Sequence, residues 1–260
     1  MAKWTAFPHL GDYDYDAASV RRQWARLHAG DAEPLPQEPQ VLEAWVLFHN
    51  GEFQKAAETG LKAGGAGGAG VTVANKATCV YANYLEKKEK TKLDLFMEVA
   101  DRAEAQASGD AKNPNAWYWQ AYALGRYSQG ISVAKALAQG LGGKVKEALE
   151  RTIKLQPKHA DAYVALAAFH AEVIDKVGSL IGGMTYGAKK DIGLKLFQDA
   201  LKINPASAIA MIEYANGLVM LEGDRRMKEA TKLYEQAAGC KPVDAMERLD
   251  VEMALAELEE

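Results

Sequence analysis

The stretch Ala230-Thr-Lys-Leu-Tyr-Glu-Gln-Ala-Ala-Gly-Cys-Lys-Pro242 indicates the fold, because two earlier stretches of the chain follow a similar pattern, the first of them loosely. The pattern is a small residue, an aromatic residue or Leu four positions later, a small residue three positions after that, and Pro five further on. Each stretch predicts a helix that ends at its proline, which lacks the amide hydrogen and clashes with the preceding turn. The earlier stretches are Lys146-Glu-Ala-Leu-Glu-Arg-Thr-Ile-Lys-Leu-Gln-Pro157 and Leu194-Lys-Leu-Phe-Gln-Asp-Ala-Leu-Lys-Ile-Asn-Pro205.

This pattern resembles the second helix of the tetratricopeptide-repeat (TPR) unit, which is a pair of antiparallel helices. One hairpin cannot bury its apolar face alone, so units stack, and small residues mark the places where helices approach closely. Residues typical of the first helix follow two of the prolines at one spacing: Tyr163, Leu166 and Ala167, then Met211, Tyr214, Ala215 and Leu218. We therefore expect an all-α, TPR-like α-α superhelix that binds a partner rather than catalyses a reaction.

Helical patterns separated by Gly, Pro and Asn residues predict about five hairpins. A lead-in with one helix is expected at residues 1–37, and the repeat domain at 38–260. The glycine-rich tract from Gly64 to Gly70 is expected to link the first two hairpins. The expected hairpins cover residues 38–63, 72–107, 114–157, 158–205 and 206–242, and a capping helix covers 244–259.

The intervals between prolines exceed the TPR unit length of about 34 residues. Pro114 and Pro157 are 43 residues apart, and Pro157 and Pro205 are 48 apart. The extra residues fall between the two helices of the third and fourth hairpins, at 126–143 and 175–190. Both inserts are too apolar for disordered linkers. We expect them to be short helices folded back onto the array, with 175–190 lying across the mouth of the concave groove and more mobile than the repeats.

The composition excludes several classes of function. The 260 residues include 31 basic and 35 acidic side chains, a net charge of −4 that is too balanced for a nucleic-acid-binding surface. Cys79 and Cys240 are far apart in the sequence, so neither a disulfide framework nor a zinc site is expected. The sequence contains neither a secretory signal nor an apolar run long enough to cross a membrane. We expect a cytoplasmic protein without membrane insertion.

Three patterns resemble known sites but lack the context that each site needs. The G-x-G-x-x-G at residues 65–70 follows a predicted helix, whereas dinucleotide binding requires a preceding strand. Asp12, Asp14 and Asp16 begin like a calcium loop but lack its central Gly and terminal Glu, so Asp16 is expected to cap a helix instead. The histidines show no metal-binding spacing, and His170 is expected to pack among other side chains. We therefore expect no cofactor, no metal and no catalytic residues.

The aromatic cluster at residues 117–127 is the strongest candidate for binding. A helix turns about 100° per residue, so these rings cannot all lie on one buried stripe, and some should face the concave groove. Packing of the whole cluster in the core is the alternative. Groove positions elsewhere are mostly apolar with a few polar groups, as in sites for small ligands or helices. The candidate groove residues are Trp45, Phe48, His49, Tyr118, Tyr122, Arg126, Asp161, Glu172, Asn216 and Met220.

The stretch from Gly125 to Leu137, followed by Lys144 to Pro157, resembles the TPR-like domain of the regulator-of-microtubule-dynamics proteins. It is also similar to the bacterial T-component family associated with TRAP transporters. The resemblance covers about residues 114–242 and implies binding of a partner or ligand without catalysis. The leading function is therefore binding of a peptide, a partner protein helix or an apolar small molecule in the concave groove. The alternative is an assembly protein that forms homo-oligomers through its terminal helices.

Overall fold

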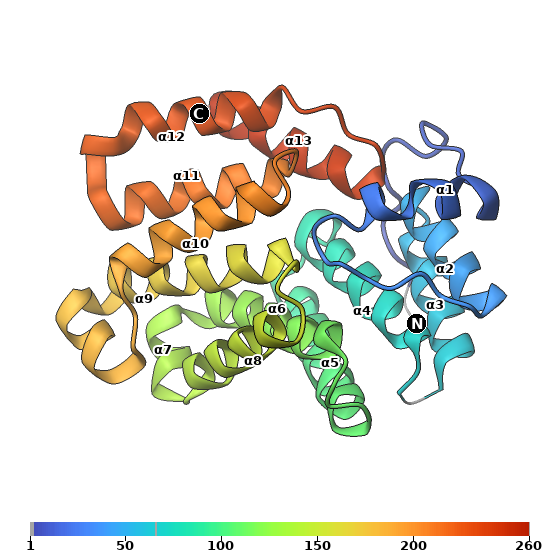
Figure 1. Ribbon diagram of the computed structural model, residues 1–260, viewed down its shortest axis with the longest axis horizontal. Coiled ribbons are helices and arrows are strands. Elements are labelled where there is room, and N and C mark those ends of the chain that lie inside the picture. Colours follow the sequence, from blue (N-terminus) through green and yellow to red (C-terminus); the bar gives the residue numbers. More distant parts are fainter. Residues whose placement is uncertain (1–2, 66, 260) are drawn as a thin grey trace.

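The computed structural model describes residues 3–65 and 67–259. Every regular element in these two ranges is a helix, which confirms the all-α prediction (Figure 1). In chain order the elements are α1 (Ala17–Leu27), α2 (Pro39–His49), α3 (Phe53–Gly64), α4 (Ala69–Val80), the π-helical turn η1 (Tyr81–Leu85), α5 (Glu89–Gly109), α6 (Pro114–Ile131), α7 (Val133–Ala138), α8 (Leu141–Leu155), α9 (Ala160–Tyr186), α10 (Lys190–Ile203), α11 (Ala208–Glu222), the 3-10 turn η2 (Gly223–Arg226), α12 (Met227–Ala238) and α13 (Ala245–Glu259).

The helices pack as successive hairpins. The pairs are α2 with α3, α4 with α5, α6 with α8, α9 with α10, and α11 with α12. The first helix of each pair also contacts the first helix of the next, so α2, α4, α6, α9 and α11 form a continuous inner row. α13 contacts α11 at one end of this row and α2 at the other. The inner helices therefore form a closed ring, whereas a plain TPR array leaves its concave face open.

The residues of the repeated pattern lie where helices cross. Ala200 and Ala237 are fully buried. A methyl group added to Gly193 of α10 would lie 3.1 Å from Cβ of His170 on α9, tighter than most side-chain contacts. The buried ring of Phe197 stacks on Tyr214 of α11, with 5.2 Å between the ring centroids. Small side chains thus let the helices approach, and the large one fills the space between them.

The glycine-rich tract forms a tight turn between α3 and α4 rather than a long link. α4 begins inside the tract, at Ala69. A methyl group on Gly70 would lie 2.2 Å from the carbonyl oxygen of Gly60, and one on Gly60 would lie 2.5 Å from the carbonyl oxygen of Gly70. The glycines are needed because the two helix backbones touch. Ala66, in the middle of the tract, lies outside the described residues.

The first insert lies against the inner helices. α6 continues to Ile131, and Ser132 caps the short helix α7, which packs on α8 and α9. Ala136 and Leu137 of α7 are buried. This insert therefore forms part of the wall between the hairpins.

The second insert does not cover the groove, so that prediction is wrong. It extends α9 to Tyr186 through a bend at Gly178, whose φ of 78° lies in the region that favours glycine. After the bend the chain folds back against Val173, which lies 3.3 Å from a Cβ built on Gly182. This places the segment at the edge of the array, where Met184 is 82% exposed (Figure 1).

The N-terminal segment covers one face of α2. Asp16 caps α1, as predicted, because its carboxylate accepts a hydrogen bond from the Ser19 amide at 2.6 Å. Trp24 of α1 packs edge-on against Trp45 of α2, with 5.9 Å between the ring centroids. α1 therefore buries a face of α2 that would otherwise meet solvent.

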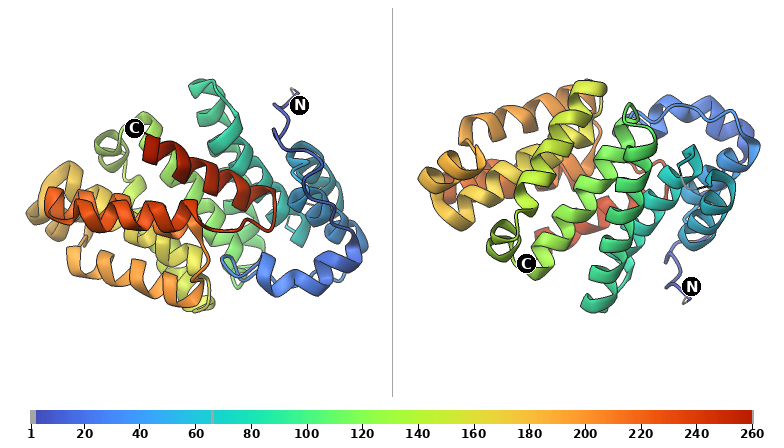
Figure 2. Two further views of the ribbon diagram at one scale, coloured as in Figure 1. Left: turned by 90° about the horizontal axis from the view of Figure 1, so that it is seen from above. Right: turned by 90° about the horizontal axis from the view of Figure 1, so that it is seen from below.

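The C-terminal helix does more than cap the last hairpin. α13 packs on α11 and α12, and Figure 2 shows it between α12 and the N-terminal helices. Asp244 Oδ2 lies 2.7 Å from His49 Nδ1 of α2, and the Arg26 guanidinium of α1 donates to Glu247 at 2.9 Å. Leu249 is buried, whereas Leu255 is 47% exposed. These long-range contacts close the ring.

Candidate functional site

A cavity lies inside the ring of inner helices. It is partly open to solvent, and the space between its walls, with the open part included, is about 1120 Å³. Its wall comes from α6, α7, α8, α9 and α11, with single residues from α4, η1 and α13. Met246, next to the residues that close the ring, is the contribution of α13. The cavity therefore depends on the closed ring as well as on the repeats.

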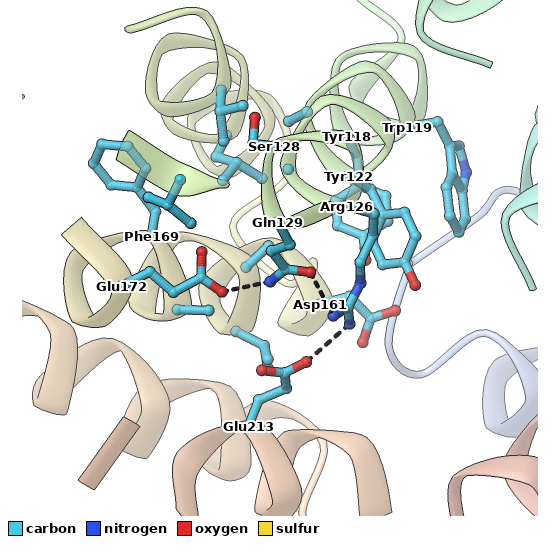
Figure 3. Close-up of a pocket in the computed structure, with 18 of the residues that line it drawn as sticks. Tyr118, Trp119, Tyr122, Arg126, Ser128, Gln129, Asp161, Phe169, Glu172 and Glu213 are labelled. Atoms are coloured by element: carbon cyan, nitrogen blue, oxygen red, sulfur yellow. Dashed lines mark hydrogen bonds and ion pairs between the residues drawn. The ribbon is translucent and has the colours of Figure 1, made fainter. Parts of the chain in front are cut away.

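One end of the cavity is apolar. Phe169 of α9 lies on this side, on the helix that also carries Glu172 (Figure 3). It is joined there by buried aliphatic side chains of α7 and α8, namely Leu137, Val145 and Leu149. No polar partner is available to a ligand from these side chains, so this end suits a hydrocarbon group.

Arg126 is the cation of the cavity wall, and it is already paired. Its guanidinium donates to Glu213 of α11 at 2.8 Å and to Gln129 at 3.1 Å, and it lies 5.2 Å from the centroid of the Tyr122 ring. Burial acts against the charge of Arg126, but Tyr122 and Glu213 hold its pKa above the usual value. The Gln129 amide in turn donates to Glu172 of α9 (Figure 3). This network ties α6 to α9 and α11.

Asp161 lies in the cavity wall beside Arg126 and the tyrosines (Figure 3). Its backbone amide donates to the Gly30 carbonyl at 3.0 Å, but its carboxylate has no hydrogen-bond or ion-pair partner among the described residues. A Cβ built on Gly30 would lie 2.4 Å from this carboxylate, so a larger residue at position 30 would displace the Asp161 side chain. Burial, followed by the nearby Asp31 carboxylate, raises the pKa of Asp161 to about 7.

Two aromatic residues of α6 in the cavity wall also carry polar atoms without partners among the described residues. Tyr118 is 5% exposed, and its hydroxyl makes no hydrogen bond within the described part of the chain. Burial, with the Asp161 charge, raises the pKa of Tyr118 well above its usual value. Trp119 packs edge-on against Tyr118 at 4.9 Å between ring centroids, and its buried Nε1 has no partner among the described residues. Buried polar groups without partners are rare in native proteins and call for an explanation.

The structure brings half of the predicted groove residues to this cavity. The five that line it are Tyr118, Tyr122, Arg126, Asp161 and Glu172. They come from α6 and α9, the inner helices of the third and fourth hairpins. The aromatic cluster at 117–127 is therefore divided between the core and the cavity wall. Whether these residues bind a ligand stays a proposal.

The other five predicted residues lie elsewhere. Trp45, Phe48 and His49 are fully buried, because α1 and the start of α13 cover α2 on the faces that would have formed the groove. Asn216 accepts a hydrogen bond from Tyr234 within the last hairpin, and Met220 is partly exposed outside the cavity wall.

Three residues of the cavity wall, Gln129, Ile209 and Glu213, were not among the ten candidate groove residues. Ile209 and Glu213 are four residues apart and face the cavity from one side of α11. α11 is apolar almost all round, so its periodicity does not mark the inner face. The signal that identifies Glu213 is its pairing with Arg126, 87 residues away, which only the folded chain displays.

The histidines and cysteines lie in structural positions. His170 is buried, as expected, and its Nδ1 accepts a hydrogen bond from the Lys189 amide at 3.0 Å. His159 caps α9 and lies 2.8 Å from Asn115 Oδ1. Cys79 and Cys240 are free thiols. Among residues 3–65 and 67–259, no group of three or more His, Cys, Asp or Glu side chains is arranged to hold a metal ion.

In the two described ranges, no helix combines the length and the apolar character that crossing a membrane requires.

Comparison with known proteins gives matches among solved structures only. No protein-family model matches the chain, and no curated protein sequence does. The crystal structure of TTC0263, a thermophilic TPR protein in Thermus thermophilus, matches 84% of this chain and 97% of its own at 14% identity, with a TM-score of 0.57. That of YrrB, a TPR protein with an unusual peptide-binding site, covers 94% of this chain and 100% of its own at 14% identity, but its TM-score of 0.42 is too low to support an argument. The narrower resemblance to the microtubule-regulator and TRAP-associated families stays a prediction. From its stacked hairpins and the TTC0263 match, the chain has the fold of the TPR superfamily.

Proposed function

We propose that this chain is a non-enzymatic binding protein that holds an elongated, mostly apolar small molecule in the cavity inside its helical ring. The observation that carries the proposal is the cavity itself, which has an apolar end at Phe169 and a polar end at Arg126 and Asp161. Small-molecule sites are concave and mostly apolar, with a few polar groups that fix the orientation of the ligand.

The closed ring favours a small ligand over an extended peptide. A peptide in a TPR groove needs a concave face that is open along several repeats. Here α13 contacts both α11 and α2, so it covers both ends of the inner row and, within the described residues, leaves no open groove along it. The terminal helices also bind one another through Arg26 and Glu247, which makes them less suited to self-association.

The cavity side chains support binding rather than catalysis. Ser128 lies in the cavity wall, and its hydroxyl could in principle act as a nucleophile. This hydroxyl donates a hydrogen bond to the Leu124 carbonyl at 2.6 Å. No histidine lines the cavity wall within the described residues, so Ser128 has no adjacent imidazole base. Asp161 and Tyr118 can instead orient a polar group of a bound molecule.

Binding of the neutral dye N-phenylnaphthylamine tests this proposal. Dye emission should rise when it enters the apolar end, and added decanol should displace it. Ala168→Phe places a ring in the cavity from α9, so it should weaken dye binding by about tenfold or more, because that volume is no longer free. Ala105→Phe, on the exposed face of α5, is the matched control and should bind the dye like the unmodified protein.

The two variants distinguish the cavity from other apolar surfaces. Equal dye binding by the Ala168→Phe and Ala105→Phe proteins would place the dye outside the cavity and refute the proposal. Circular dichroism of both variants should match that of the unmodified protein, because Ala168 lies in the cavity wall and Ala105 is exposed.

A further inference from the structure

The cavity wall carries more carboxylates than cations. Asp161, Glu172 and Glu213 line it together with a single basic side chain among the described residues, Arg126. Arg126 is bound by Glu213 and Gln129, so it is not free to bind an anionic group of a ligand. A carboxylate or phosphate entering the cavity would therefore meet like charges without an available cation.

Of the three carboxylates in the cavity wall, Asp161 is the one without a partner among the described residues. Glu213 binds Arg126, and Glu172 accepts from Gln129, whereas the Asp161 carboxylate has neither a hydrogen bond nor an ion pair among the described residues. The neighbouring residue Tyr118 is 5% exposed, and its hydroxyl makes no hydrogen bond within the same part of the chain. Two neighbouring polar groups thus face the cavity with unused hydrogen-bonding capacity.

Aromatic rings surround this end of the cavity. Tyr118, Trp119 and Tyr122 lie within about one turn of α6, with 4.9 to 6.0 Å between their ring centroids. Tyr84 of η1 adds a fourth ring to the wall. An organic cation gains both from the negative faces of such rings and from an unpaired carboxylate.

Other charges act on Asp161 from each element packed around it. Asp31 follows α1 and Glu247 lies on α13, and both disfavour its ionised form. Lys76 of α4 favours the ionised form, but its ammonium group is bound to Asp31 at 2.6 Å. Arg126 on α6 is bound to Glu213. Within the described residues, Asp161 therefore has no free cation nearby, and a ligand can supply one.

We propose, on the basis of the proposed function, that the cavity binds an amphiphilic organic amine. Its ammonium group is held by the Asp161 carboxylate and the Tyr118 ring and hydroxyl oxygen, and its hydrocarbon tail extends toward Phe169 and Leu137. The class of ligand is a protonated alkyl- or arylalkylamine, as opposed to a fatty acid or another anionic amphiphile.

Three compounds of equal chain length test the charge preference on the intact protein: decylamine, decanol and decanoate. Isothermal titration calorimetry at pH 7.5 should give the tightest binding for decylamine, weaker binding for decanol and the weakest for decanoate. Decylamine should exceed decanoate by at least about tenfold, because the cavity offers the anion no free partner.

Asp161→Asn removes the charge while keeping the shape of the side chain. It should weaken decylamine binding by about tenfold or more and leave decanol binding within about twofold. Asp101→Asn, on the exposed face of α5, changes the net charge of the protein equally and is the matched control. It should leave the affinity for all three compounds unchanged.

The pH dependence of decylamine binding is an independent test of the role of Asp161. An alkylamine stays protonated below pH 9, like a Lys side chain of pKa about 10.4. Asp161, with a pKa of about 7, loses its charge as the pH falls, so decylamine affinity should drop by about 30-fold from pH 8 to pH 5.5. The Asp161→Asn protein should show no such dependence.

The outcomes separate this inference from the proposed function. If decanol binds but decylamine is not preferred over decanoate, or if Asp161→Asn weakens all three compounds equally, the amine inference is wrong and the apolar cavity stands. If none of the three compounds binds, both proposals fail.

Discussion

Asp244→Ala removes the side chain that ties the start of α13 to α2. Asp244 is buried and makes two contacts: Oδ2 lies 2.7 Å from His49 Nδ1, and Oδ1 accepts the Glu247 amide at 2.9 Å. Loss of the amide contact removes a helix cap, worth about 1 kcal/mol. Loss of the contact with His49 leaves its fully buried Nδ1 without a partner, which costs about 1–3 kcal/mol. The free energy of unfolding should therefore fall by about 2–4 kcal/mol.

Urea unfolding followed by far-UV circular dichroism measures this loss. Asp244→Asn is the informative companion, because its amide oxygen can still cap α13 and its side chain can still reach His49, so it should lose less stability than Asp244→Ala. Asp224→Ala, at an exposed site in η2, is the control and should change the free energy of unfolding by less than about 0.5 kcal/mol. The dependence of that energy on urea should stay constant, so that midpoints compare directly.

The same variant tests whether ring closure shapes the cavity. Met246 lines the cavity two residues after Asp244, so loosening this segment should also weaken binding of N-phenylnaphthylamine. An Asp244→Ala protein as stable as the Asp224→Ala control would show that the buried His49 contact does not hold α13 in place. Closure of the ring by this segment would then be refuted.

Glu33 is buried, and burial raises its pKa to about 8, above the usual value near 4.5, so the unmodified protein should lose stability as the pH rises from about 4.5 to 8; Glu33→Gln should flatten this part of the stability profile measured by urea unfolding. Gly70→Ala should destabilise the protein by about 1–3 kcal/mol, because its methyl group meets the Gly60 carbonyl, whereas Gly143→Ala, with open space at its Cβ, should stabilise α8 by up to about 1 kcal/mol in thermal unfolding. Met184→Ser should change neither dye binding nor stability by more than about 0.5 kcal/mol, because this side chain is exposed at the edge of the array, and a large loss of binding would restore the insert to the mouth of the cavity.

Local sequence patterns are sufficient to predict the helix pairs of the C-terminal half. Pro157, Pro205 and Pro242 follow the ends of α8, α10 and α12, and the small residues of the pattern, such as Ala200 and Ala237, are buried at helix crossings. These features can be read from the sequence because a helix end and a close helix contact depend on residues within a few turns of one another. The presence of both inserts could be predicted for the same reason, from the distance between prolines.

Which helix faces line the cavity and which lie in the core depends on tertiary contacts. α2 carries buried residues on several sides, and α11 is apolar almost all round, so neither periodicity distinguishes the groove from the core. The choice depends on segments distant in the sequence: Asp244 closes over His49 from 195 residues away, and Glu213 reaches Arg126 across 87. Tyr118 and Asp161 could be named as candidates because they lie on inner helices of neighbouring repeats. That they share a cavity follows from closure of the ring, which depends on contacts between the two ends of the chain and leaves no periodic pattern in the sequence.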